Sequence, residues 1–497
     1  MPAEQAPPRD YGGWRRRRGI GLWGLGAAGT LAVLAAVILL IVVAAADVAA
    51  LAYVAPPVII AGGVGLARAS GEPIALLAIR RLRWWHASAR GYTKYLASVV
   101  TEHAAGFTLP GVLAPAMLLS AEDGYGGRYG IVCDRRTGML TPTLRVVPAS
   151  TWLADRADAD SWVANWGGWL ASLGYVPTLK WVTVTVDTAP EPGSTLADAV
   201  AGAVDPAAPA AARQIMSQLV AAAPAAAADV DTRVSLTFDP KASPAAPGSL
   251  TEAAAEAGRA LIGLESALGG CGVTVLGRLS DAEIAGVVRA AFDPAARGEI
   301  LRLAARSRAG ADPAPLEWAD AGPVGAEEFA DHYRHDGGIS VTWAWHEAPR
   351  QNVTASVLAR LISPGPYPKR VAMQYRPFPA AAATRVLEAE VNAAAFRERY
   401  RHRTGRDETA RDAHDQARAR QAAAEEAAGA GVCLISMFVT VTVASTEDLA
   451  HAVAWTEAAA ESSKIRLRRM TYSQAAGFAA TLPCGICPAD LARRMPH

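Results

Sequence analysis

Trp181–Asp187 reads WVTVTVD, and Val439–Val443 repeats its core as VTVTV. Valine alternating with threonine is typical of a strand that buries one face and exposes the other. Each stretch lies in a series that starts with a hairpin and then alternates helices with strands, although the two stretches occupy different places in their series. We therefore expect an α+β body made of two duplicated units, 111–310 and 324–483.

The strands and helices of the two units can be placed from periodicity and turn residues. The first unit is expected to contain strands Tyr129–Asp134, Leu140–Val147, Trp181–Asp187, Thr232–Phe238 and Val273–Leu276, with helices Asp158–Leu173, Ala207–Ala223 and Leu250–Leu268. The second is expected to contain strands His332–Arg334, Ile339–Trp345, Arg370–Tyr375, Val432–Val443 and Ile465–Arg469, with helices Asn352–Leu361 and Thr446–Ser462. A long charged helix over 380–429 interrupts it, either as a projecting arm or as a solvated helix without a partner.

The N-terminal part is far more apolar than the rest. Ile20–Ala46 has 27 residues without a charge, and Val48–Ala67 follows after the single charge of Asp47. Because about 20 helical residues cross a hydrocarbon core, the two runs predict a transmembrane helical hairpin over 20–67. The alternative is a signal peptide followed by a buried helix, although the first run is longer than a signal core.

Arginines flank both apolar runs. Arg15–Arg18 precede the first run, and Arg68, Arg80, Arg81 and Arg83 follow the second. The positive-inside rule then places the tail 1–19 and everything after residue 67 in the cytoplasm, as a plasma-membrane protein with two spans and both termini inside. The segment 68–110 carries Trp84 and Trp85 among its arginines and is expected to lie along the lipid surface.

Composition and missing motifs exclude several functions. The 497 residues carry a net charge of +1, whereas a nucleic-acid binder would need a basic excess. None of the five lysines follows a glycine, so a phosphate-binding P-loop is missing, and so is the Gly-x-Ser-x-Gly elbow of esterases. We therefore expect a protein that is not an enzyme, with no catalytic residue and no cofactor.

Two groups of residues resemble metal or redox sites only in part. Cys484 and Cys487 form a CxxC pair in a tail over 484–497, but no second pair accompanies them, so we interpret them as incidental. His332, His335 and His346 lie around the second hairpin and are interpreted as strand and turn residues. His346-Glu347 lacks the second histidine of a zinc-protease helix.

Three tryptophans share one face of the helix predicted over Asp158–Leu173. Trp162, Trp166 and Trp169 are spaced by four and three residues. This spacing indicates packing against the core, with use in an interface as the alternative.

Short motifs along the chain carry a resemblance to a known family. They are Tyr11–Arg15, Arg83-Trp84, Gly91-Tyr92, Leu109–Ala114, Asp123-Gly124, Trp166–Gly174 followed by Val182–Val186, and Phe478–Pro483. The chain resembles an actinobacterial family of integral membrane proteins encoded beside type IV secretion-like, conjugation-type ATPases. The resemblance implies a soluble part similar to the non-catalytic N-terminal domain of that ATPase, fused to its two-helix membrane subunit. The chain ends near Pro483, where the motor domain would begin, so docking carries over and catalysis does not.

The resemblance implies a membrane-anchored structural subunit of a type IV secretion or conjugation machine that docks a separate motor ATPase. Its partners would be that ATPase, other membrane subunits and the lipid bilayer, within a hetero-oligomer and without direct contact to nucleic acid. Two alternatives stay open. One is the EccE component of type VII secretion, which also places two N-terminal helices before a cytoplasmic α+β domain. The other is a membrane sensor with a cytoplasmic ligand-binding domain.

Overall fold

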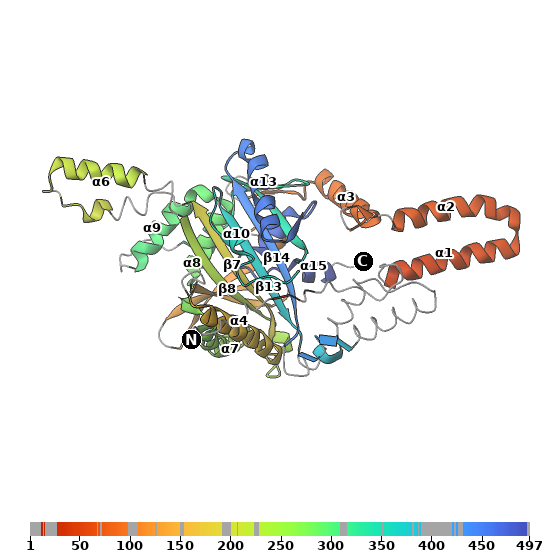
Figure 1. Cartoon of the computed structure of the whole chain (residues 1–497), viewed down its shortest axis with the longest axis horizontal. Helices are drawn as coiled ribbons and strands as arrows, with labels where there is room; N and C mark the ends of the chain where they lie inside the picture. The colour runs from red at the N-terminus through yellow and green to blue at the C-terminus, as the bar shows by residue number, and fades with distance from the viewer. Residues whose placement is uncertain are drawn as a thin grey trace, which may run out of the picture. The chain divides into compact units, whose positions relative to one another are not determined.

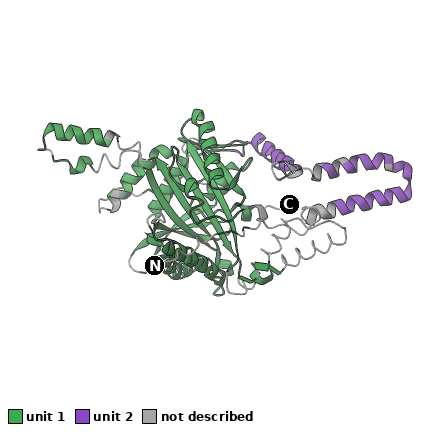
Figure 2. Ribbon diagram, viewed as in Figure 1, with its two compact units in different colours: residues 1–13, 94–391, 408–497 green, residues 14–93, 392–407 purple. Residues whose placement is uncertain are grey.

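The computed structural model describes residues 11–494 apart from 13, 15–26, 67, 70–71, 98–107, 125–126, 150–153, 191–199, 206, 223–227, 309–315, 350, 380–381, 386, 389–419, 422–423 and 426–430. The chain divides into two compact units, which Figure 2 colours separately. One unit contains residues 14–93 and 392–407, and the other contains residues 1–13, 94–391 and 408–497.

The smaller unit contains the apolar N-terminal segment. Its elements are α1 (Ala27–Ala46), α2 (Val48–Leu66), the paired strands β1 (Arg68–Ala69) and β2 (Glu72–Pro73), and α3 (Ile74–Ala89). Asp47 separates α1 from α2, and its Oδ1 accepts a hydrogen bond of 2.8 Å from the backbone N–H of Ala49 at the start of α2.

The predicted transmembrane hairpin is wrong. Within the ranges that the structure describes, none of the helices combines the length and the apolar character needed to cross a bilayer. The first span was expected to begin at Ile20; α1 is described from Ala27, and residues 20–26 of the expected span lie outside the described residues.

The larger unit is built on one sheet. Its 13 strands, counted over the described residues, are β3 (Lys94–Leu96), β4 (Ala116–Glu122), β5 (Arg128–Asp134), β6 (Leu140–Pro148), β7 (Leu179–Pro190), β8 (Ala228–Phe238), β9 (Val273–Arg278), β10 (Gly325–Glu328), β11 (Tyr333–His335), β12 (Gly338–Glu347), β13 (Lys369–Pro377), β14 (Cys433–Val443) and β15 (Arg466–Arg469). The order across the sheet is β3-β10-β11-β12-β14-β13-β7-β8-β6-β5-β4, with β9 beside β6 and β15 beside β12. The pairings described are antiparallel throughout.

The larger unit also contains helices, some of which cover the two faces of the sheet. They are α4 (Arg156–Ser172), α6 (Ala210–Ala222), α7 (Leu250–Leu268), α8 (Asp281–Phe292), α9 (Arg297–Arg308), α10 (Ala359–Ile362), α13 (Thr446–Ser462), α14 (Gln474–Ala480) and α15 (Pro488–Arg494). The helix predicted over Asn352–Leu361 is reduced to α10, because Val353 instead forms a backbone bridge with Tyr11. Helices α8 and α9 were not predicted, although Ser280 and Glu283 form a capping box at the start of α8.

The sheet contains a repeated topology. The first series runs β4-β5-β6-β8-β7 across the sheet and the second runs β10-β11-β12-β14-β13, each with one extra strand beside its third member. The two series meet at β7 and β13, which pair from Thr188 with Lys369 to Val182 with Tyr375 and lie side by side in Figure 1. The expected fold, a transmembrane hairpin followed by an α+β region of two duplicated units, is thus corrected to one sheet of described antiparallel pairings with helices, which the hydrogen bonds between β7 and β13 make continuous.

Both faces of the central strands are buried. Val182 and Val184 pack with α4 and α7 in one apolar core, while α8 and α14 belong to a second core on the opposite face. The threonine side is closed too: Thr342 Oγ1 lies 2.8 Å from Thr440 Oγ1, and a Cβ on Gly477 of α14 would lie 2.7 Å from the Thr342 methyl group. In β7 itself, Thr183 and Thr185 are only 5% and 4% exposed, so the prediction that Trp181–Asp187 is half-buried is wrong.

Candidate functional site

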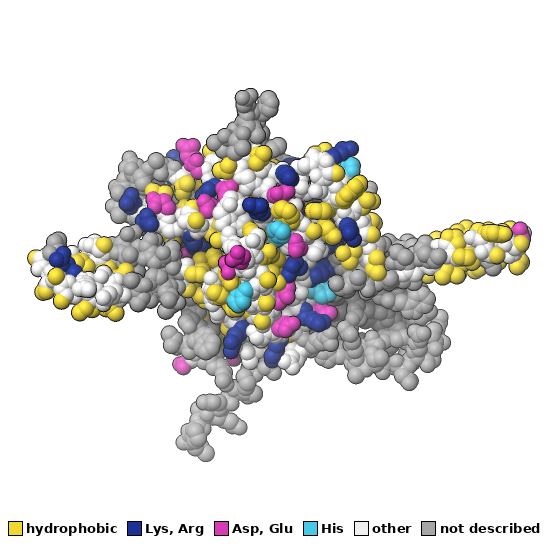
Figure 3. Space-filling model, turned by 90° about the horizontal axis from the view of Figure 1, so that it is seen from above, with side chains coloured by type: hydrophobic (Ala, Val, Ile, Leu, Met, Phe, Trp, Pro, Cys, Tyr) yellow, Lys and Arg dark blue, Asp and Glu magenta, His cyan; other side chains and the backbone are white. Residues whose placement is uncertain are grey.

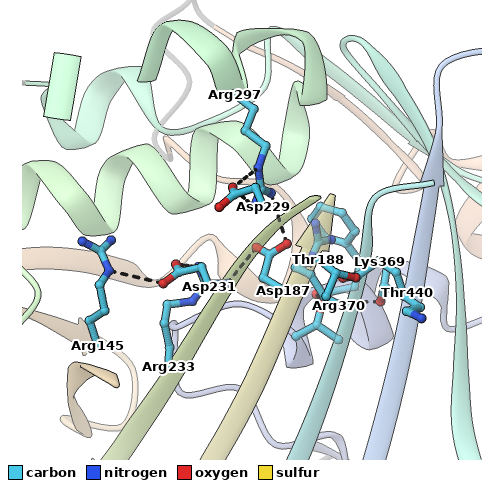
Figure 4. A network of polar contacts seen from close by, with 12 residues as sticks. Arg145, Asp187, Thr188, Asp229, Asp231, Arg233, Arg297, Lys369, Arg370 and Thr440 are labelled. Carbon is cyan, nitrogen blue, oxygen red and sulfur yellow. Dashed lines mark hydrogen bonds and ion pairs between the residues drawn. The ribbon is translucent and has the colours of Figure 1, made fainter. Parts of the chain in front are cut away.

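A chain of alternating charges crosses the sheet where β7 ends and β8 begins (Figure 4). At its centre, Asp187 Oδ2 accepts a hydrogen bond of 2.9 Å from Arg233 Nη2 of β8, and Oδ1 accepts one of 3.1 Å from Arg297 Nη1 of α9. Arg233 also binds Asp231 through Nη1. The Asp187 and Arg233 side chains are only 8% and 2% exposed, and charges so buried require partners because they have lost their hydration.

The chain continues in both directions. Asp231 accepts from Arg145 Nε of β6 at 3.2 Å, and Arg145 Nη1 donates to Glu283 of α8 at 2.8 Å. On the other side, Arg297 donates through both Nη2 and Nε to Asp229 Oδ2, at 2.7 and 3.0 Å. Asp229 and Asp231 share one face of β8 because successive side chains of a strand alternate. The network therefore ties three strands to α8 and α9.

The electrostatics of the chain centre on Asp187. Burial alone would raise its pKa, but Arg297, Arg233 and Arg370 together hold the pKa of this carboxyl far below its usual range. Arg370 faces Asp187 across the β7–β13 pair and donates through Nε to Thr481 Oγ1 at 3.1 Å. Burial lowers the pKa of Arg370 to about 10, and Arg233 and Arg297 add to this effect while Asp187 opposes it. Asp187 thus holds several buried cations together.

A cavity of about 410 Å³ lies against the charged chain. Seven charged side chains line it, and the remaining lining comes mainly from small and apolar residues of α8 and α9, such as Val287, Ala290, Ile300 and Leu301. At Gly286, a Cβ would lie 2.9 Å from Ile300, so this glycine lets the two helices approach closely. The described lining contains no histidine, cysteine or lysine, and arginines engage its carboxylates.

The histidines singled out in the sequence do not form a metal site. His335 is buried, and its two ring nitrogens contact the Phe292 carbonyl oxygen and, at 2.8 Å, Ser340 Oγ. Burial lowers the pKa of His335 to about 4, so the ring is neutral at pH 7. His332 contacts its neighbouring aspartate, and His346 lies further along β12. Over the described part of the chain, no group of three or more histidine, cysteine or carboxylate side chains could hold a metal ion.

Cys484 and Cys487, interpreted from the sequence as incidental residues of a tail, are buried free thiols. Cys487 packs with Met139 and Trp181, and the backbone oxygen of Ile486 accepts a hydrogen bond of 2.7 Å from the Gln374 amide. Burial raises the pKa of Cys484 to about 12, which keeps it protonated and unreactive.

The three tryptophans of α4 are used in packing. Trp166 and Trp169 stack with their ring centroids 4.9 Å apart, and Trp169 Nε1 donates to the backbone oxygen of Leu264 in α7 at 3.2 Å. Trp162 lies against Gly272, where a Cβ would come within 2.5 Å of its ring. The tryptophan face therefore joins α4 to α7 and its C-terminal turn.

Helix α6 differs from the other helices of this unit in its exposure. Its side chains are exposed from Ala210 to Leu219, including Ile215 (57%), Met216 (41%) and Leu219 (59%). Figure 3 shows apolar atoms on the surface of this helix, at the left of the view. The sequence predicted the helix but not its lack of packing. The predicted charged helix 380–429 lies mostly outside the described residues.

The chain matches no family model, and no curated protein is significantly similar to it. These comparisons neither support nor exclude the resemblance to secretion proteins.

Proposed function

We propose that the protein is a non-catalytic subunit that binds other proteins and docks a separate motor ATPase of a type IV secretion-like transfer machine. The observation that carries the proposal is the exposed apolar stripe of α6, formed by Ile215, Met216 and Leu219. The choice of machine rests on the short motifs described above, and the EccE component of type VII secretion is the alternative.

An exposed apolar helix of this length favours a protein partner. α6 has 13 residues, and helices this short are marginal in water unless an apolar face is packed. Ile215 and Leu219 are one turn apart with Met216 beside them, so a single groove can take all three. Burial of each side chain in a partner would contribute about 1.5–3 kcal/mol. Anchors with this spacing are typical of a helix that binds in a hydrophobic groove.

A second contact is expected from the connection between β13 and β14. It occupies the same place in the second series as α6 occupies in the first, between the fourth and fifth strands. Deleting 400–428 should weaken the complex with the ATPase and leave the sheet folded, because Pro377 and Cys433 already pair at the base of this connection.

Substitutions on α6 test the proposal. The double variant Ile215→Asp/Leu219→Asp should lose the ATPase in affinity purification after crosslinking in cells. The control Gln214→Asp/Ser217→Asp places the same two charges on the polar side of α6 and should retain it. Equal recovery of the ATPase with both variants would contradict a role for the apolar stripe.

A further inference from the structure

We propose that the cavity beside the alternating charges binds a small organic cation, a primary ammonium group attached to a compact apolar body. This inference does not depend on the docking function, because the cavity is formed by β6, β7, β8, α8 and α9 and not by α6.

The charges that line the cavity favour a cation. Three arginines line the cavity with three aspartates and one glutamate, and Arg370, which faces Asp187 from outside the lining, balances the fourth carboxylate. The carboxylate most available to a ligand is that of Asp229, because the two hydrogen bonds that Arg297 donates to it both go to Oδ2. Asp229 lines the cavity and its side chain is 23% exposed, so an oxygen of its carboxylate is within reach of a ligand. An ammonium group is the natural complement of such an oxygen, since charge-assisted hydrogen bonds are the stronger ones.

An anion fits this lining less well. The arginine donors already point at carboxylates: Arg145 at Asp231 and Glu283, and Arg233 at Asp231 and Asp187. An incoming anion would have to displace one of these carboxylates and leave it buried without a partner, which is costly.

The rest of the lining requires an apolar body. Val287, Ile300 and Leu301 are only half-buried and line the cavity from α8 and α9. A bare ammonium ion would leave these side chains in contact with water, whereas an amphipathic amine covers them and removes their apolar surface from water.

Three probes of one shape separate the contributions of charge and apolar contact. Cyclohexylammonium, cyclohexanol and cyclohexanecarboxylate are titrated into the full chain at low salt, and binding is measured by calorimetry. The ammonium probe should bind with a Kd of about 1 mM or tighter, the alcohol at least about tenfold more weakly, and the carboxylate more weakly still. Equal or tighter binding of the carboxylate would overturn the proposal, as would failure of the ammonium probe to bind below about 10 mM.

Variants locate the site. Asp229→Asn should weaken the ammonium probe about tenfold and leave the alcohol unchanged. Ala290→Phe fills the cavity and should abolish binding of both. The control Glu299→Gln removes an exposed charge of α9 that pairs with Arg302, and it should change the affinity of neither the ammonium probe nor the alcohol. Far-UV circular dichroism verifies that each variant is folded; if Asp229→Asn does not fold, Ala290→Phe decides the location. Unchanged binding in a folded Asp229→Asn or in Ala290→Phe would refute the assignment.

Discussion

Asp187 binds Arg233 of β8 and Arg297 of α9 where these side chains are largely buried. Water therefore cannot take the place of the carboxylate as their partner. Both of its oxygens are engaged, and Arg370 adds a third cation from β13. Its role is therefore to neutralise buried guanidinium groups where the two series of strands join, and its contribution should appear as stability.

Replacement of Asp187 by asparagine should destabilise the protein by about 3–5 kcal/mol, because it leaves Arg233 and Arg297 buried without their shared counter-charge. Urea unfolding at pH 7 measures this. Glu299→Gln, which removes an exposed carboxylate, should stay within about 0.5 kcal/mol of the unchanged protein. The ionised Asp187 carboxylate stabilises the protein at pH values above its pKa in the unfolded chain, about 4, and this stabilisation is lost as the pH falls further. The asparagine variant should therefore lack this loss of stability in acid. A difference below about 1 kcal/mol would contradict the importance of this pairing.

His335 should make stability depend on mildly acidic pH. Its pKa is lowered to about 4 in the folded protein and is about 6.5 in the unfolded chain, so its contribution is fully present above pH 6.5 and is lost as the pH falls toward 4. The unfolding free energy should therefore decrease, relative to His335→Gln, by up to about 1.4 kcal/mol per pH unit across this window. Equal pH profiles for the two proteins would show that the ring is not buried in its neutral form.

The charged chain was only partly predictable from the sequence. Asp229, Asp231 and Arg233 alternate along a strand, a pattern that places three charges on one face and could have indicated a buried network. Asp187 and Arg297 are far from them in sequence, and no local pattern shows that the ends of β7 and α9 meet there.

Helix α4 is fixed by its tryptophans. Trp169→Ala should cost about 3–5 kcal/mol, because it leaves a cavity between α4 and α7 and removes the hydrogen bond to Leu264. Denaturant unfolding measures the loss. Ser161→Ala on the exposed side of α4 should change the free energy of unfolding by less than about 0.5 kcal/mol. A small effect of Trp169→Ala would indicate that the tryptophan face is not needed for packing.

The longer strands were predictable because their alternation is regular, whereas β4 and β10 were missed. The pattern around Trp181–Asp187 predicted the strand correctly. It wrongly predicted that the threonines face solvent, because a hydroxyl group can bind either water or a buried partner. Pairs such as Thr143 Oγ1 with Ser235 Oγ, 2.9 Å apart, satisfy each other inside the protein. Only the register of β6 against β8 shows that these two hydroxyl groups face each other.

The continuous sheet makes the two series depend on each other. Expressed alone, 111–310 would expose the edge of β7 and 324–494 the edge of β13, and long unpaired strand edges promote aggregation. Each half should therefore be insoluble alone and recover as a complex when both are coexpressed, as measured by size-exclusion chromatography. A soluble, folded monomer of either half would contradict this dependence.

The repeated order of elements was visible in the sequence, but the pairing of β7 with β13, where the two series join, was not. The pattern of β7 or β13 specifies which side chains share a face, and it does not say which strand lies alongside. The membrane prediction failed for a related reason. An apolar run shows the composition of a segment, but the helices described over that segment lack the combination of length and apolar character that a membrane span requires.

Identification of what copurifies with the intact protein tests the central claim most directly. The protein is isolated from native cells by mild extraction after crosslinking, and the complex is sized and analysed by mass spectrometry. The account predicts a high-mass assembly that contains an ATPase with the phosphate-binding loop that this chain lacks. A lone monomer or dimer, with no ATPase attached under any crosslinking condition, would contradict it.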